Sequence, residues 1–321
     1  GDYLDLVALG TIADLVKLAG ENRYYAQLGL RCMAAGLRPA LSAMLDCAGY
    51  RNTGITESLI GYTLAPRLNA VGRLEDAGRN VDFLLSEDTG FLERTAGWLE
   101  DLSSQRKLAV EGVYQSARTM LEKEPALAQY AVLVLAKSGW EKGVVGIAAS
   151  RLVEEFNKPA VLLNIDQETA AGSVRSVAGI DIISAIRANA AYLITYGGHP
   201  MAAGLSLEAA QLPAFREALS QTVRTAAKGL PAESLLQVDA CLPLSNLTLD
   251  LADEIDRLAP FGSGNPPPVL VTRALESNKP FPLGKNEEHL KMTVHDESGE
   301  TREVLWWNVR GRKAPQGRFD L

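Results

Sequence analysis

The stretch from residue 91 to residue 123 restricts the fold more than any other part of the sequence. Its apolar side chains recur with the 3.6-residue period of an α-helix, while Arg, Glu, Lys and Gln occupy the other faces. The apolar positions are 92, 96, 99, 102, 110, 113, 117 and 120. Pro125 ends the pattern. We therefore expect one long connecting helix over residues 91–125, with compact regions on both sides of it.

The size and charge of the chain limit its class. At 321 residues it is long for a single hydrophobic core, so two or three domains are expected. The net charge of −7 argues against a surface that is basic all over, and any phosphate-binding surface must then be a confined cleft. No apolar run reaches the roughly 18–20 residues of a membrane span, and no signal peptide opens the chain, so we expect a cytoplasmic protein without membrane association.

The region before the long helix, residues 1–90, predicts one strand and several helices. The apolar residues of 5–9 favour a short buried strand. Helices are expected from Asn22, over 38–49 and over 56–64, with Pro66 ending the last of them. Three scattered cysteines give no spacing typical of a zinc site or a disulfide framework.

Two further regions follow the long helix. In residues 126–228 strands and helices alternate, which favours an α/β layer domain. The expected elements are strands at 131–135, 160–165 and 201–205, helices at 144–156 and 212–227, and a helix capped by Asp181. Residues 232–321 read as short strands (235–242, 269–274, 289–295 and 302–307), one helix (249–258) and a turn-rich loop (260–268). That pattern predicts a small β-barrel, with the OB-fold as the leading candidate.

Two glycine-rich segments of the α/β region carry the groups that a phosphate needs. One supplies hydroxyls, a guanidinium and exposed amides through Gly172, Ser173, Val174, Arg175 and Ser176. The other places His199 directly after Gly197 and Gly198, at what we expect to be a tight turn. Each segment alone is as consistent with an ordinary surface turn or a structural histidine. Both together in one α/β unit favour phosphate binding.

Polar residues of the N-terminal region are weaker candidates. Arg67 and Arg73 frame Asn69 in a predicted loop after Pro66, where two arginines could grip adjacent phosphates. A solvated loop is the alternative. Asp14 follows the predicted strand, at the position where α/β enzymes place ligands, although a helix cap is an equal alternative. A two-metal phosphodiesterase needs several Asp and His ligands, and without a DxD, an HxH or paired histidines the sequence offers at most one of them, Asp14.

These motifs, in this order, resemble the RecJ-type exonucleases of the DHH phosphoesterase superfamily. The similar segments are residues 8–14 with Asp14, residues 65–73 with Arg67 and Arg73, residues 143–152, the 172–176 segment, the 197–199 segment and residues 260–266. The similarity is colinear over nearly the whole chain. It implies an α/β protein made of a C-terminal part of a DHH catalytic domain (1–90), the connecting helix (91–125), a DHHA1 domain (126–228) and a truncated OB-like β-barrel (232–321).

The resemblance also implies roles for individual residues. Asp14 would be the catalytic metal ligand for Mn²⁺ or Mg²⁺. The DNA phosphate near the cleaved 5′ end would meet Ser173, Arg175, Ser176 and His199. Arg67, Asn69 and Arg73 would lie along the strand path. The OB-like region would guide single-stranded DNA with a basic rim and two tryptophans, for which the candidates are Arg302, Arg310, Arg312, Lys313, Arg318, Trp306 and Trp307.

The implied function is 5′→3′ single-stranded-DNA exonuclease activity in DNA repair and recombination, through two-metal phosphodiester hydrolysis. The partners would be single-stranded DNA and, for a monomeric enzyme, a single-strand-binding protein or other repair proteins. The DHH histidines and the earlier aspartates of the family precede Gly1, and Trp140 to Lys142 replace an expected histidine, so this chain alone is expected to be inactive. The alternatives are an oligonucleotide or cyclic-dinucleotide phosphodiesterase and a catalytically inactive nucleic-acid-binding scaffold, which the segment upstream of Gly1 would discriminate.

Overall fold

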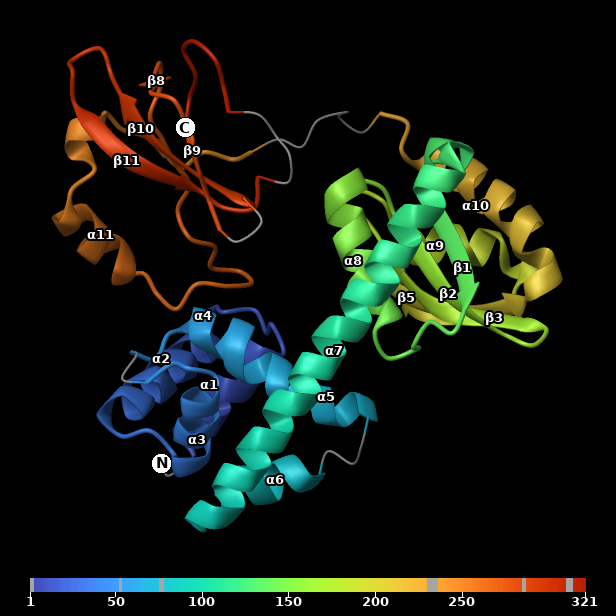
Figure 1. Cartoon of the computed structure of the whole chain (residues 1–321), viewed down its shortest axis with the longest axis horizontal. Helices are drawn as coiled ribbons and strands as arrows, with labels where there is room; N and C mark the ends of the chain where they lie inside the picture. Colours follow the sequence, from blue (N-terminus) through green and yellow to red (C-terminus); the bar gives the residue numbers. More distant parts are fainter. Residues whose placement is uncertain (1–2, 52–53, 75–77, 230–235, 285–286, 310–313) are drawn as a thin grey trace. The chain divides into compact units, whose positions relative to one another are not determined.

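The computed structural model (Figure 1) describes residues 3–51, 54–74, 78–229, 236–284, 287–309 and 314–321, and the side chains of 72–74 lie outside this description. The chain divides into two compact units. Unit 1 comprises Gly1–Gly36, Gly54–Gly61 and Glu233–Leu321, and unit 2 comprises Leu37–Thr53 and Tyr62–Ala232. The long predicted helix belongs to unit 2.

The N-terminal part of unit 1 is helical. It contains α1 (Leu4–Ala13), α2 (Gly20–Ala35) and the short α4 (Glu57–Leu59). The predicted strand at residues 5–9 is therefore wrong. A short apolar run fits a strand and a buried helix equally, and here the buried positions are Ala8, Leu9 and Ile12, which share one helical face. Helices α1 and α2 cross closely, since a β-carbon at Gly29 of α2 would lie 2.2 Å from the Leu4 carbonyl oxygen of α1.

The C-terminal part of unit 1 is built from short strands. A four-stranded antiparallel sheet contains β8 (Glu276–Ser277), β9 (Phe281–Leu283), β10 (His289–His295) and β11 (Thr301–Trp306). A separate parallel pair joins β6 (Ala240–Cys241) to β7 (Leu270–Val271). The 3₁₀ turn η5 (Leu244–Asn246) and helix α11 (Leu249–Asp256) lie between them in sequence. Within the residues described, these OB-like sheets do not close into a barrel, and the long first strand predicted at 235–242 shrinks to two residues.

The alternation predicted for β10 is confirmed. Met292 and Val294 are buried with Leu244 and Leu275, and Trp306 packs against this cluster. The outer face of the same sheet carries the alternate residues, which are partly exposed.

Unit 2 begins with helices packed along the long helix. They are α3 (Pro39–Cys47), α5 (Ala65–Leu74) and α6 (Gly78–Leu85), with the π-helical segment η1 (Ile60–Leu64) leading into α5. The long helix itself is confirmed as α7 (Thr89–Lys123), capped by the Asp88 carboxylate. The predicted helix end at Pro66 is wrong. The helical path continues through Pro66, the second residue of α5, directly after the π-helical turn Ile60–Leu64.

The rest of unit 2 is a five-stranded sheet in the order β1-β2-β3-β5-β4. Its strands are β1 (Leu133–Ser138), β2 (Ala160–Asp166), β3 (Thr169–Arg175), β4 (Thr195–His199) and β5 (Ala202–Glu208). Only β1 and β2 run parallel; the other pairs are antiparallel. The predicted glycine-rich loops at 172–176 and 197–199 are thus mostly strand, and only Ser176 lies beyond the end of β3.

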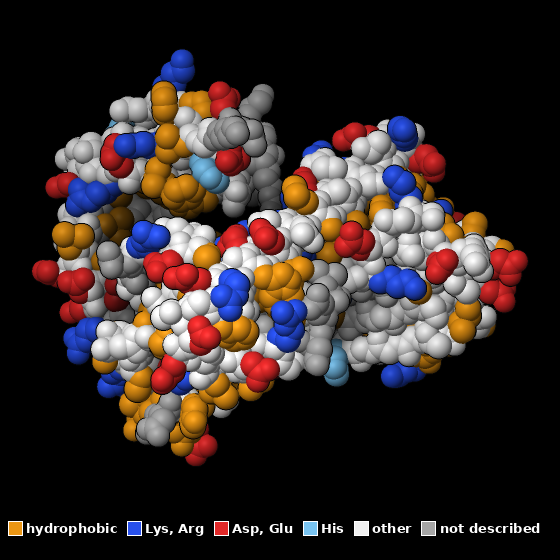
Figure 2. Space-filling view, turned by 60° about the horizontal axis from the view of Figure 1, so that its bottom comes forward, with side chains coloured by type: hydrophobic (Ala, Val, Ile, Leu, Met, Phe, Trp, Pro, Cys, Tyr) orange, Lys and Arg blue, Asp and Glu red, His pale blue; other side chains and the backbone are white. Residues whose placement is uncertain are grey.

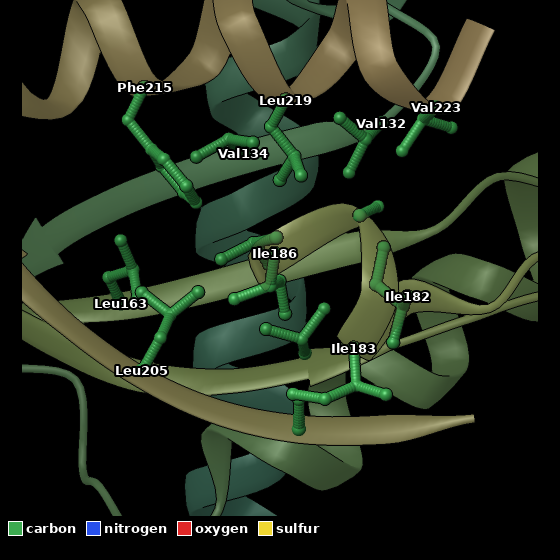
Figure 3. Close-up of a cluster of buried hydrophobic side chains, with 14 of the residues drawn as sticks. Val132, Val134, Leu163, Ile182, Ile183, Ile186, Leu205, Phe215, Leu219 and Val223 are labelled. Carbon is green, nitrogen blue, oxygen red and sulfur yellow. The ribbon is translucent and has the colours of Figure 1, made fainter. Parts of the chain in front are cut away.

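Helices cover both faces of this sheet. On one face lie α8 (Val145–Phe156) and the C-terminal half of α7, whose Val113 and Ala117 pack with Leu152. On the other face lie α9 (Ile182–Ala188) and α10 (Leu212–Ala226). Figure 3 shows their side chains pointing into this core, among them Ile182, Ile186, Phe215, Leu219 and Val223. Three 3₁₀ turns complete the unit: η2 (Pro125–Gln129), η3 (Ala190–Tyr192) and η4 (Ala209–Gln211).

The predicted cap of α9 is confirmed. The Asp181 carboxylate accepts a hydrogen bond from the Ser184 amide at 3.2 Å and another from its hydroxyl at 2.8 Å. These bonds stabilise the ionised carboxylate and lower the pKa of Asp181 below its ordinary value.

Candidate nucleic-acid interface

The pairing register of unit 2 brings Arg175 and His199 onto one face of the sheet. Both residues pair with Ala202, Arg175 from β3 and His199 from β4. Directly opposed residues of antiparallel strands point to the same face. Neighbouring strands lie about 4.8 Å apart, so the backbones of Arg175 and His199 are separated by about 10 Å. A phosphodiester group fits between two basic side chains at that separation.

The floor between them has almost no side chains. At the position two residues away from Ala202 along β5, Gly204 pairs with Ser173 of β3 on one side and with Gly197 of β4 on the other. Both glycines are exposed, and a β-carbon would meet nothing within 4 Å at Gly197 and only the Gly172 oxygen at 3.7 Å at Gly204. A polymer backbone can therefore approach the sheet closely along this glycine floor.

The first turn of α8 borders the floor. A β-carbon at Gly146 would lie 2.8 Å from Nη2 of Arg175 and 3.3 Å from Cβ of Ser173, so only glycine lets the guanidinium lie against the helix. Arg175 is half-buried and donates from Nη1 to the Val174 carbonyl at 2.8 Å, which fixes its orientation. A helix N-terminus carries partial positive charge. Together with Arg175 it makes this border attractive to anions.

Two hydroxyls extend the same face and were missed by the sequence analysis. Thr195 pairs with Ser206, which pairs with Ala171, and the hydroxyl oxygens of Thr195 and Ser206 are 2.7 Å apart. Thr195 is exposed on the edge strand β4. Gly146 was not predicted either. Thr195 and Ser206 join the interface only through the strand register, and Gly146 only through the placement of α8, and neither can be read from local sequence. The one available signal was the spacing of Thr195 from His199, which places both on one face of a strand.

Ser176 and Arg67 point elsewhere. Ser176 is buried, and its hydroxyl donates to the Ile180 carbonyl at 2.8 Å. The Arg67 guanidinium is buried, with Nε 2.6 Å from the Glu100 carboxylate and Nη1 2.7 Å from the Thr63 carbonyl. The ion pair with Glu100 attaches α5 to α7. The loop predicted around Arg67 is a helix, because Ala70 and Val71 bury an apolar face there.

The remaining N-terminal candidates are on helices. Asn69 is exposed on α5, and Arg73 belongs to the same helix with a side chain outside the described set. Asp14 is exposed at the C-terminal end of α1, where its amide donates to the Gly10 carbonyl. The strand that was expected to present Asp14 does not exist.

A divalent metal ion does not fit the described residues. Nowhere among them do three His, Cys, Asp or Glu side chains gather in a group that could hold one. Asp14 supplies one carboxylate oxygen pair, whereas a two-metal site needs several ligands.

The two candidate tryptophans of unit 1 lie in different environments. Trp306 packs on the buried cluster, while Trp307 is 58% exposed and stacks edge-on with His289 at 4.7 Å. The predicted basic rim is largely neutralised where it is described, since Arg302 pairs with Glu300, and Arg318 with Glu276 and Glu297. Arg310, Arg312 and Lys313 lie outside the described residues.

Charge on the surface is mixed rather than basic. Figure 2 shows Lys and Arg interspersed with Asp and Glu over the face in view, as the net charge of −7 led us to expect. Among the described residues, no helix has the length and apolar character to cross a membrane.

Comparison with known proteins identifies the family. The model of the DHHA1 domain matches residues 127–225, and that of the RecJ OB domain matches residues 238–321. The single-stranded-DNA-specific exonuclease RecJ of Bacillus subtilis (strain 168) is 39% identical over 303 residues, or 93% of this chain. The chain belongs to the RecJ family. RecJ of Escherichia coli (strain K12) is 32% identical over 93% of the chain.

The similarity to RecJ extends to solved structures. Crystal structures of RecJ from Thermus thermophilus in complex with Mg²⁺ and with Mn²⁺ match with TM-scores of 0.81 and 0.80 at 29% identity, and they cover 99% and 98% of this chain. RecJ structures thus hold both of the expected divalent metals. The chain spans 38% of the Bacillus subtilis RecJ, 52% of the Escherichia coli RecJ and 48% of the first of these crystal chains.

Proposed function

We propose that this chain is the DNA-backbone-binding part of a RecJ-type 5′→3′ single-stranded-DNA exonuclease that acts in DNA repair and recombination. The observation that carries the proposal is the juxtaposition of Arg175, His199 and the first turn of α8 around the glycine floor. Basic groups on both sides of a side-chain-free floor suit a phosphodiester backbone. Relatives named as single-stranded-DNA-specific exonucleases support the choice of polymer.

In this proposal the residues of the interface have different roles in binding the DNA backbone. Arg175 contacts a phosphate as a charged donor, and His199 donates a ring N–H from the opposite side. Ser173, Thr195 and Ser206 supply neutral hydrogen bonds along the same face. Ser176 and Arg67 act indirectly, Ser176 by fixing the chain after β3 and Arg67 by holding α5 on α7.

The strand path beyond the floor is also part of the proposal. Asn69, which is exposed on α5, contacts it, and Arg73 is a candidate by its sequence position alone. In unit 1, Trp307 stacks on a base, because its ring is exposed next to His289. Trp306 has the supporting role that its packing on the buried cluster gives it.

We keep the proposed role of Asp14 as a ligand of Mn²⁺ or Mg²⁺. Bound with further ligands, the metal ion would activate a water molecule and neutralise the charge that develops on the phosphate. Because the described residues give Asp14 no such companions, the purified chain is expected to bind single-stranded DNA and hydrolyse none. The measurement is incubation of a 5′-labelled oligonucleotide with the chain and added Mn²⁺. Nucleotide release above a no-protein control would contradict the expectation.

Replacement of Arg175 by alanine is expected to weaken single-stranded-DNA binding about tenfold, as loss of a charge-assisted hydrogen bond does. The slope of log affinity against log salt should fall by about 0.7, the value for one phosphate contact on a single strand. Fluorescence anisotropy over a salt series measures both quantities. Arg187→Ala is the matched control, because Arg187 is exposed on α9, which covers the opposite face of the sheet. Equal slopes for the two variants would exclude the proposed contact.

A further inference from the structure

A loop from the C-terminal part of unit 1 is docked on the N-terminal helices of the same unit. Four hydrogen bonds hold residues 258–265 there. Arg23 donates to the Leu258 carbonyl at 2.6 Å, Gln27 to the Ala259 carbonyl at 2.9 Å, and the Phe261 amide to the Glu57 carboxylate at 3.0 Å. The fourth runs from the Leu18 amide to the Ser263 carbonyl at 2.6 Å. Acceptors and donors from α2, α4 and the α1–α2 turn thus surround the 258–265 loop.

Two glycines allow this close approach. A β-carbon at Gly264, where φ is +77°, would lie 2.4 Å from Cγ of Lys17. One at Gly262 would lie 2.9 Å from Cδ1 of Leu18, whose side chain is buried. The loop therefore packs directly on two consecutive residues of the α1–α2 turn, with no space for side chains between them.

The turn in contact with the loop is the one that begins at Asp14. Its first part is bonded to α1, since the Leu15 amide donates to Ile12 and the Val16 amide to Thr11. Leu15 has the unfavourable φ of +54°, which surrounding contacts must hold in place. At the other end, the Leu18 amide is bonded to Ser263.

We propose that the 258–265 loop is a positioning element for the Asp14 turn. One end of the turn is anchored by α1 and the other by the loop, so loosening the loop leaves the turn held at its α1 end alone. The consequence for activity rests on the proposed role of Asp14, whereas the mechanical coupling does not. The loop leads directly into the OB-like strands, so the part of the chain proposed to guide DNA also determines how Asp14 is presented.

Hydrogen exchange resolved by residue or short peptide tests the coupling in the whole chain. Gly264→Ala should increase exchange of the Leu18 amide at least tenfold, because the new methyl group collides with Lys17 and breaks the bond to Ser263. Gly299→Ala is the control: it has the same strain, at φ +85°, with nothing within 4 Å. Lys17→Ala, which removes Cγ and the atoms beyond it, should restore protection to the Gly264→Ala chain.

A second variant covers the case in which Gly264→Ala does not fold. Glu57→Ala removes only the acceptor of the Phe261 amide, and should raise exchange at Leu18 severalfold while α7 stays protected. The proposal is overturned if both glycine variants change Leu18 equally, if Lys17→Ala restores nothing, or if exchange rises evenly along the chain. Asp14→Ala should leave the exchange of Leu18 unchanged, so failure of the metal-ligand role is distinguishable from failure of the coupling.

Discussion

Replacement of Gly172 by alanine is expected to unfold unit 2. In β3, a β-carbon at this position would lie 2.0 Å from the Leu162 carbonyl oxygen and 2.9 Å from Cα of Leu163. Both atoms belong to the backbone of β2, which pairs with β3, so no side-chain rotation relieves the collision, and the two strands must separate. The expected loss is more than about 4 kcal/mol, the range reached only by severe disruption of a core. Urea denaturation followed by circular dichroism measures it.

The matched control for this prediction is Gly204→Ala. Gly204 lies in the neighbouring strand β5, where a β-carbon would have the Gly172 oxygen at 3.7 Å as its nearest contact. Alanine costs less backbone entropy than glycine in a strand, so Gly204→Ala should change the free energy of unfolding by no more than about 1 kcal/mol. Similar destabilisation of both variants would show that β2 and β3 do not approach each other as described.

Long periodic helices could be predicted from the sequence, and the reason is local. In α7 the apolar period, the Asp88 cap and Pro125 all act within a few residues of the positions they affect. The same holds for α9 with its Asp181 cap. The strand predicted at residues 5–9 was wrong because an apolar run of five residues fits both the strand period and the helix period. Packing of α1 against Gly29 of α2, which is distant in sequence, favours the helix.

The glycine-rich segments show why the candidate site could be predicted only in part. Gly172 and Gly197 suggested turns, but a strand also needs glycine where another backbone comes close or a ligand is admitted. Their order along the chain still placed Arg175 and His199 in one domain. Their shared face depends on the register with Ala202, and sequence does not reveal a register. Thr195 and Gly146 stayed hidden for that reason.

Arg67 illustrates the opposite error. An arginine near a proline and a glycine resembles a phosphate contact, yet its guanidinium is buried against Glu100. Buried arginines need a charged partner. That partner lies 33 residues further along the chain, on α7. Local sequence cannot distinguish an arginine that binds a ligand from one that joins two helices.

Replacement of Gly197 by valine is expected to reduce single-stranded-DNA binding by at least tenfold without loss of stability. Gly197 is exposed on the edge strand β4, has no neighbour within 4 Å of a β-carbon, and lies on the same face as His199. Valine suits a strand, so unfolding should be unchanged, while its two methyl groups fill the floor and keep a phosphate from reaching Arg175 and His199. Anisotropy at a fixed salt concentration measures binding, since affinity for DNA has no meaning without it.

Thr195→Val is the control that distinguishes the contribution of the glycine floor to DNA binding from that of the neighbouring hydroxyls. It changes the same strand and the same face but adds no bulk, and it removes only the hydroxyl 2.7 Å from Ser206. The loss of one neutral hydrogen bond should weaken binding about fivefold or less. If Gly197→Val binds DNA as the unmodified chain does, the floor is not in contact with the strand, and Arg175 and His199 cannot hold one phosphodiester between them. If Thr195→Val is as damaging as Gly197→Val, the polar edge rather than the open floor determines binding.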